Sequence, residues 1–231
     1  MKRRSAMMAA LGWTGTFGGA ASAQAPAQPV GELKSLGQDR YQAGRVVIDK
    51  RARSFSVPGR VHALGKPLEY LATTPGGMKA YESLFELDTT ATEFNLACIL
   101  IGLERDPKQV PWQRFRESTL IGQRLNIQVA WTADGKRHQV PAAQALLNAD
   151  ADIKPESVEW VYTGAPASDM LGRFSAEDTG TLIGVIHDVN CIIDSVATLG
   201  IGAYGSIRGH AMLPQNGSPI ELLVQAATAN K

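Results

Sequence analysis

Two adjacent polar residues, Glu82 and Ser83, stand in an apolar stretch of the sequence just before a predicted helix. Helix N-termini hold anions through free N–H groups and the helix dipole, so Ser83 with Thr89 and Thr90 would line a small polar pocket. In an extended strand Tyr81 and Ser83 share one face and Glu82 points to the other. The three converge only if the strand bulges. In the alternative interpretation, Glu82 and Ser83 satisfy local backbone groups.

A serine nucleophile needs a histidine and an acid close to it in space. His187 ends an apolar run, so Ser83, Glu82 and His187 form the candidate set for a hydrolase-type enzyme or for an enzyme or redox accessory subunit. Ser83 lacks the Gly-x-Ser-x-Gly elbow that presents a nucleophile on a strand-to-helix turn. Because no catalytic constellation is complete, enzymatic activity stays uncertain and a non-enzymatic role is favoured.

Patterns for metals and cofactors are weak in this sequence. His187, Asp188 and His210 offer imidazole and carboxylate groups, which suit zinc or copper, but their spacing does not demand a site. Cys98 and Cys191 are the two cysteines, and they form no iron–sulfur or zinc motif. We therefore predict no cofactor and no metal, and a Cys98–Cys191 disulfide stays open.

Two aromatic residues, Trp160 and Tyr162, alternate with a valine in a predicted strand and would share one sheet face. Together with Tyr81, Glu82 and Ser83 they form the predicted contact region for a small ligand or a partner protein. The competing interpretation places the two aromatic side chains in the core.

Residues 1–23 have the pattern of a signal peptide. Residues 2–4 (Lys-Arg-Arg) precede an apolar, small-residue centre, and residues 21–23 (Ala-Ser-Ala) match a signal-peptidase site. The apolar centre is too short to cross a bilayer. The two arginines also permit twin-arginine export instead of the general secretory route. We expect a periplasmic or secreted protein without an integral membrane span in the mature chain.

Removal of this segment leaves 208 of the 231 residues and takes the formal net charge from +1 to −2, because three cations are lost. Nucleic-acid binding depends on clustered lysine and arginine, so no nucleic-acid partner is predicted. Residues 24–45 begin with a Pro-, Ala- and Gln-rich run and are predicted to be a flexible tether. Residues 46–231 suit a single domain with a sizeable core.

The element that would position these residues is a helix over about Ala91 to Leu103. Thr90 and Glu93 form a Thr-x-x-Glu capping box, which fixes its start. From Phe94 onward the residues are apolar around nearly the whole circumference, so the helix must be covered on most sides.

Alternating apolar and polar residues predict short strands around this helix. Two hairpins are expected over 46–57 and 68–87, and a tight Asp-Gly turn follows the strand 125–131. The expected remaining elements are strands at 158–164, 181–186 and 220–224 and short helices at 141–148 and 191–199. The predicted fold class is α+β, with a mainly antiparallel sheet packed on the buried central helix and one or two short helices.

Three segments follow one another in a distinctive order: LEYLATTPGGMKAYESLFELDTTATEFNLACILIGL, then Trp-Val-Tyr-Thr-Gly, then GTLIGVIHDVNCIID. Together they resemble the YdjY-domain family of exported bacterial proteins, over about Val46 to Val224. The most specific part is Glu-Ser-Leu at 82–84, between a Gly-Gly turn and the capped helix.

In that family a histidine usually precedes the Glu-Ser pair, whereas this chain has Tyr81. This chain therefore lacks the side chain that would serve any metal-binding or acid–base role of that histidine. Some relatives are linked by name to ferredoxin-type proteins, but the ferredoxin cysteine pattern is absent. The family has no settled biochemical activity. The resemblance implies an exported domain, most simply a non-enzymatic one that binds a partner protein or a small ligand.

Overall fold

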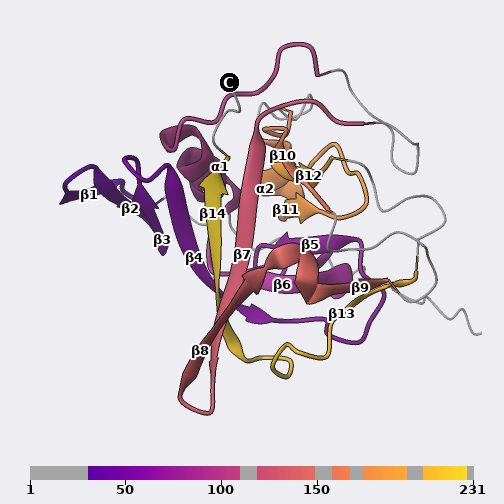
Figure 1. Cartoon of the computed structure of the whole chain (residues 1–231). Coiled ribbons are helices and arrows are strands. Elements are labelled where there is room, and N and C mark those ends of the chain that lie inside the picture. The colour runs from indigo at the N-terminus through magenta and orange to yellow at the C-terminus, as the bar shows by residue number, and fades with distance from the viewer. Residues whose placement is uncertain (1–30, 110–118, 149–157, 167–173, 197–204, 228–231) are drawn as a thin grey trace, which may run out of the picture.

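The computed structural model describes residues 31–109, 119–148, 158–166, 174–196 and 205–227. Eight strands pair side by side until the last meets the first, which makes a closed barrel (Figure 1). In order around the barrel they are β4 (Ser54–Val61), β14 (Pro219–Ala226), β7 (Arg124–Ala133), β10 (Trp160–Tyr162), β12 (Ile193–Ser195), β11 (Thr181–Gly184), β5 (Tyr70–Thr73) and β6 (Ser83–Leu87).

The barrel closes where β4 meets β6. Neighbouring strands are antiparallel except in the pairs β11–β12 and β5–β6, which are parallel. At the closure Gly59 lies opposite Leu87. A Cβ atom on Gly59 would lie 2.4 Å from the carbonyl oxygen of Glu86. The backbones of β4 and β6 therefore approach so closely that the position requires glycine.

Side chains from alternate positions of the strands fill the barrel interior, as the period of two in a strand requires. In β4 the buried positions hold Phe55, Val57 and Val61, while the serines between them lie on the outer face. The long strands β14 and β7 follow the same alternation and contribute Ile220, Leu222, Val224, Leu125, Ile127 and Val129.

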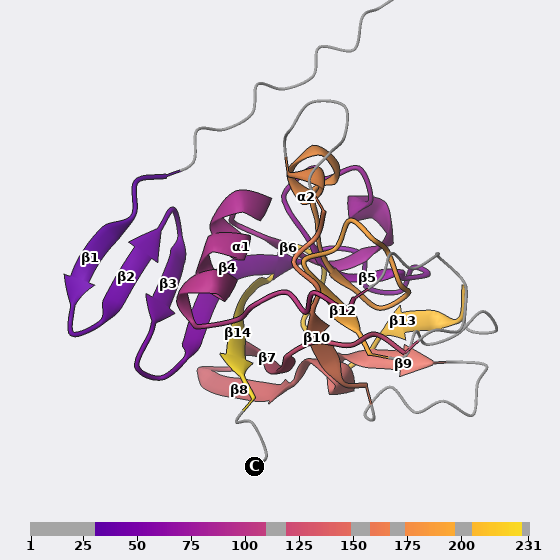
Figure 2. The same ribbon diagram turned by 90° about the horizontal axis from the view of Figure 1, so that it is seen from above.

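One end of the barrel is covered by helix α1 (Ala91–Leu100), which follows β6 after a short turn. Thr90 Oγ1 accepts from the Glu93 N–H at 3.1 Å, and Glu93 Oε2 accepts from the Thr90 N–H at 3.1 Å. The Phe94 ring meets the Phe55 ring edge to face, with 5.2 Å between centroids. Figure 2 shows α1 lying beside β4. The capping box predicted from the sequence is confirmed.

The other elements extend the barrel wall or flank it. A hairpin turn joins β7 to β8 at Asp134 and Gly135, whose φ angles of 52° and 71° are those of a tight turn. The remaining elements are β1 (Lys34–Gly37), β2 (Arg40–Ala43), β3 (Val46–Asp49), β8 (Lys136–Pro141), β9 (Leu146–Asn148), β13 (Ile207–Gly209), the helix α2 (Ser175–Thr179) and the one-turn 3-10 helices η1 (Ala80–Glu82) and η2 (Ala142–Ala145). No helix within the described ranges is long and apolar enough to cross a membrane.

The predicted α+β fold, with a sheet packed on a central helix over 91–103, is wrong. The strands close on themselves and fill their own interior, so α1 covers an end of the barrel and does not form its centre. The helix ends at Leu100, and the side chain of Ile99 is 52% exposed. A run of apolar residues indicated burial on all sides, but only the face that carries Phe94, Ala97 and Cys98 is fully covered.

Local predictions fared better where pairing is between neighbours in the chain. The hairpin over 46–57 is confirmed by the pairing of β3 with β4. The hairpin over 68–87 is wrong, because β5 and β6 run parallel and η1 lies between them. The helix expected at 141–148 is one 3-10 turn followed by β9.

Two further expectations fail within the described residues. The helix expected at 191–199 is replaced by β12, and residues 197–199 lie outside the described ranges. The tether expected over 24–45 contains β1 and β2 from residue 34 onward. These strands pair with each other and with β3, so they continue the sheet outward from β4. The predicted signal peptide, 1–23, lies outside the described residues.

Candidate functional site

A groove lies along β7, at the place where this strand changes its pairing partner from β10 to β8. On one edge β7 pairs with β10 only at Arg124 and Leu125, and its pairing with β8 begins at Gln128. Asn126 and Ile127 therefore pair with neither β10 nor β8 on this edge. The groove that opens there has a volume of about 650 Å³.

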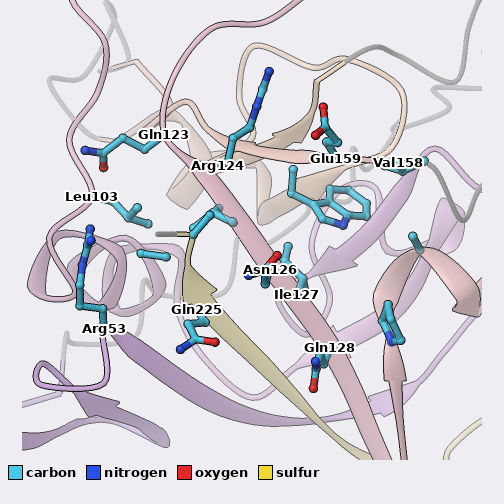
Figure 3. A pocket seen from close by; sticks show the side chains of 16 residues that line it. Arg53, Leu103, Gln123, Arg124, Asn126, Ile127, Gln128, Val158, Glu159 and Gln225 are labelled. Carbon is cyan, nitrogen blue, oxygen red and sulfur yellow. The ribbon is translucent and has the colours of Figure 1, made fainter. Parts of the chain in front are cut away.

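Polar and apolar side chains line this groove, which we call the β7 groove. Figure 3 shows Gln123 and Arg53 on one side of β7, Glu159 on the other, and Arg124 between them. The complete lining is Arg53, Leu103, Gln123, Arg124, Leu125, Asn126, Ile127, Gln128, Pro141, Ala143, Val158, Glu159, Trp160, Gln225, Ala226 and Ala227.

The two arginines reach the groove from different elements. Arg53, in the turn between β3 and β4, donates from Nε to the Ile101 carbonyl at 3.2 Å and from Nη2 to the Gly102 carbonyl at 3.4 Å. These carbonyls directly follow α1 at its C-terminus. Carbonyl groups there lack helical hydrogen-bond partners, and cations are favoured. Arg124 begins β7. Its Nη1 atom is buried and has no hydrogen-bond partner among the described residues.

The amide side chains of the groove are partly oriented by the protein. Gln123 Oε1 accepts from the Glu104 N–H at 3.0 Å, so the amide nitrogen of Gln123 is left to donate elsewhere. The Gln128 oxygen accepts from the amide of Gln139, while Gln225 Nε2 donates to the Ala52 carbonyl at 3.4 Å. The groove thus offers mainly N–H donors at its Gln123 end.

A second groove of about 460 Å³ adjoins the first across β14 and β4. The two grooves share Asn126, Gln128 and Gln225. The second one adds the outward hydroxyls of β4 and one acidic and one basic residue from β2 and β3, namely Ser54, Ser56, Asp49 and Arg40. Polar surface therefore continues from the β7 groove over the outer face of the sheet.

The residues predicted around the Glu-Ser pair lie apart from this groove. Ser83 is fully buried, and its hydroxyl donates to the Phe85 carbonyl at 2.9 Å. Tyr81 is 55% exposed, and the Lys79 ammonium lies 5.4 Å from its ring centroid. Lys79 also lies 3.8 Å from Glu82 Oε2. Tyr81 and Glu82 line a separate cavity of about 350 Å³ with Leu68.

The two aromatic residues of β10 are both buried. Trp160 lines the β7 groove, whereas Tyr81 lines the separate cavity, so the predicted contact region falls into two places. The Tyr162 hydroxyl donates to Asn95 Oδ1 at 2.8 Å and so ties β10 to α1. Burial raises the pKa of Tyr162, and the side chain stays a neutral donor.

His187 and its neighbour Asp188 are bound into the barrel wall. His187 Nε2 lies 2.9 Å from the Ser195 carbonyl, and burial lowers the pKa of the imidazole below its ordinary value. Asp188 Oδ2 accepts from the Tyr70 hydroxyl at 2.5 Å. His210 Nδ1 accepts from the Met212 N–H at 3.0 Å. Each of these side chains is thereby held by a contact that positions local structure.

Neither the metal set nor the cysteine pair is assembled in the part of the chain that the structure describes. The described residues contain no group of three or more His, Cys, Asp or Glu side chains that would hold a metal ion. Cys98 and Cys191 are both buried, and no disulfide joins them. Burial raises the pKa of the Cys98 thiol, so this residue acts as a small apolar side chain.

Sequence reasoning missed the residues of the β7 groove. Arg124, Asn126 and Gln128 are the polar half of the alternating strand, which indicates an outward face and nothing more. The groove depends on β7 leaving β10 and joining β8, which is a property of long-range pairing. Arg53 arrives from a turn more than seventy residues earlier in the chain, and no local signal links it to β7.

A family model described as the YdjY domain matches residues 46–225. The chain belongs to the YdjY-domain family. The resemblance inferred from the sequence is thereby confirmed, and the match covers β7 and β14 as far as Gln225, so it includes the strands that contribute lining residues to the β7 groove. Searches of curated proteins and of solved structures found no match to this YdjY-domain chain.

Proposed function

We propose that this YdjY-domain protein is an exported, non-enzymatic domain that binds a small ligand in the β7 groove. The observation that carries the proposal is the groove itself, whose volume of about 650 Å³ suits a small molecule. Such sites combine apolar walls with a few polar groups that fix orientation. Leu103, Val158 and Trp160 would contact the body of a ligand, while the arginines and amides would bind its polar atoms.

Export to the periplasm is part of the proposal and rests on the pattern of residues 1–23. A binding domain in that compartment would meet small metabolites or the exposed parts of other exported proteins. A protein partner is therefore the alternative occupant of the β7 groove, as the sequence also suggested.

The contacts of Ser83 favour binding over hydrolysis. A serine nucleophile must give its proton to a nearby imidazole, whereas the Ser83 hydroxyl is buried and donates to the Phe85 carbonyl. The enzyme hypothesis built on Ser83, Glu82 and His187 would need all three to rearrange. Tyr81 and Glu82 are instead a second candidate contact surface, because they line a cavity of their own.

Nuclear magnetic resonance of the side-chain amides tests the proposal directly. Isotope-labelled protein, purified after export, would be titrated with fractionated small-molecule extracts of the periplasm. The amide resonances of Gln123, Asn126 and Gln225 should shift with an active fraction. Those of Gln42 and Asn216 should not, because these two side chains lie outside the groove and hold the Gly44 carbonyl and the Leu64 N–H.

Shifts confined to the side chains around Tyr81 and Glu82 would move the ligand to the other cavity. If no fraction shifted any groove resonance while the protein turned over a defined substrate, the binding proposal would be overturned. Shifts only with purified protein partners would leave the groove as the site and replace the small ligand by a protein.

A further inference from the structure

Among the described residues, neither of the two guanidinium groups in the β7 groove is neutralised by a carboxylate. The ion pairs of the barrel's other arginines lie elsewhere: Arg45 with Asp88 at 2.9 Å, Arg137 with Glu221 at 2.7 Å, and Arg60 with Glu86. Arg53 contacts two backbone carbonyls, which carry no formal charge. Arg124 Nη1 is buried without a hydrogen-bond partner.

A buried donor without a partner is costly, by about 1–3 kcal/mol and more when the group is charged. An arginine side chain is charged at every physiological pH, so loss of a proton does not relieve this cost. A bound anion would relieve the cost by accepting the hydrogen bond. One carboxylate, Glu159, is present in the groove lining, and it forms no ion pair with Arg124 among the described residues.

The neighbouring amide points to the same chemistry. A backbone N–H can only donate, so the contact from Glu104 fixes the orientation of the Gln123 amide with its oxygen occupied. Gln123 therefore presents N–H donors in the same groove lining as the two arginines. Donor groups in one groove lining suit a ligand that brings acceptor oxygens.

We infer that the β7 groove binds a small organic carboxylate, with its carboxylate group on Arg124. The inference rests on the proposed function and names its ligand class. The planar fork of an arginine matches a carboxylate through two parallel hydrogen bonds. The apolar side chains of Leu103, Val158 and Trp160 favour an ion with a carbon body over inorganic phosphate.

Isothermal titration calorimetry with paired probes tests this class. Glutarate, adipate and phenylpropionate would each be compared with the corresponding neutral amide, and inorganic phosphate would be run alongside. We expect at least one of the acids to bind, and its amide to bind about 10-fold more weakly or worse, because hydrogen bonds to charged groups are stronger than those between neutral groups. Phosphate should bind more weakly than the best acid.

Variants locate the contact. Arg124→Gln should weaken binding of the best acid by about 10- to 100-fold, the loss expected for a hydrogen bond to a charged group. Arg124→Lys keeps the charge without the fork and should give an intermediate loss. Arg45→Gln is the matched control, since Arg45 is exposed and pairs with Asp88 away from the groove. An unchanged denaturation midpoint would show that each variant is folded.

Equal binding of acids and amides, or an Arg124→Gln variant that is folded and binds the best acid as tightly as wild type, would overturn the carboxylate assignment. So would the absence of binding by all the acids, or tighter binding of phosphate. None of these results touches the proposed function, which fails if no small-molecule fraction shifts the amide resonances of the groove.

Discussion

Buried polar side chains in two regions of the molecule differ in whether the protein itself supplies their hydrogen-bond partners. In the buried part of the fold, the Ser83 hydroxyl and the His187 imidazole are held by backbone carbonyls at 2.9 Å. On β7, Arg124 buries a guanidinium nitrogen that forms no hydrogen bond with a described residue. Buried polar groups are normally paired. The buried Ser83 and His187 side chains therefore serve the fold, whereas Arg124 on β7 keeps a donor available for a ligand.

The prediction with the largest expected effect on stability concerns the buried side of α1. Phe94→Ala removes a fully buried ring that packs on Phe55 and should lower the free energy of unfolding by about 3–5 kcal/mol. Ile99→Ala, on the exposed side of the same helix, should cost less than about 1 kcal/mol. Denaturant unfolding measures both. Similar losses for the two variants would mean that α1 does not cover the barrel end as described.

A methyl group at the barrel closure should have the next largest effect. Gly59→Ala places a Cβ atom 2.4 Å from the Glu86 carbonyl oxygen and should destabilise the protein by about 1–3 kcal/mol. Asn126→Ala on the outer face should change stability by about 0.5 kcal/mol or less, because β7 there carries no ladder on that edge. Thermal unfolding compares the two. A harmless Gly59→Ala would contradict a closed β4–β6 seam.

The smallest expected effect is the contribution of His187 to the pH dependence of stability. Because burial lowers its pKa in the folded protein, the unfolded chain binds a proton at pH values where the folded chain does not. Its contribution to stability is complete above the unfolded pKa of about 6.5 and falls as pH drops below that value. A His187→Gln variant should lose stability less steeply than wild type between about pH 7 and 5. Parallel curves would show that His187 is not buried as a neutral ring.

How far the sequence predicted this molecule depends on the distance between interacting residues. The capping box at Thr90 and Glu93 and the β7–β8 turn involve neighbours, and both follow from residue types. The closure of the barrel joins Gly59 to Leu87, and the parallel pairing of β5 with β6 needs a crossover; neither has a local signature. Alternation showed which faces are apolar, but it could not show that the sheet closes on itself.

The candidate site illustrates the same limit. Ser83 attracted notice because it is polar within an apolar strand, yet its hydroxyl only completes a backbone contact. The alternation of residues placed Arg124 and Asn126 on an ordinary solvent-exposed face of a strand. In the structure they line a groove, because β7 stops pairing with β10 and begins to pair with β8 there. A polar residue out of pattern was therefore a weaker guide than a strand that changes partners.

The most direct test of a ligand site outside the barrel is the set of nuclear Overhauser contacts between a bound ligand and the protein. We predict contacts from ligand protons to the methyl groups of Val158 and to the side-chain amides of Asn126 and Gln225. Contacts to the ring of Tyr81 or the methyl groups of Leu68, which line the separate cavity, with none to the β7 groove, would contradict the account.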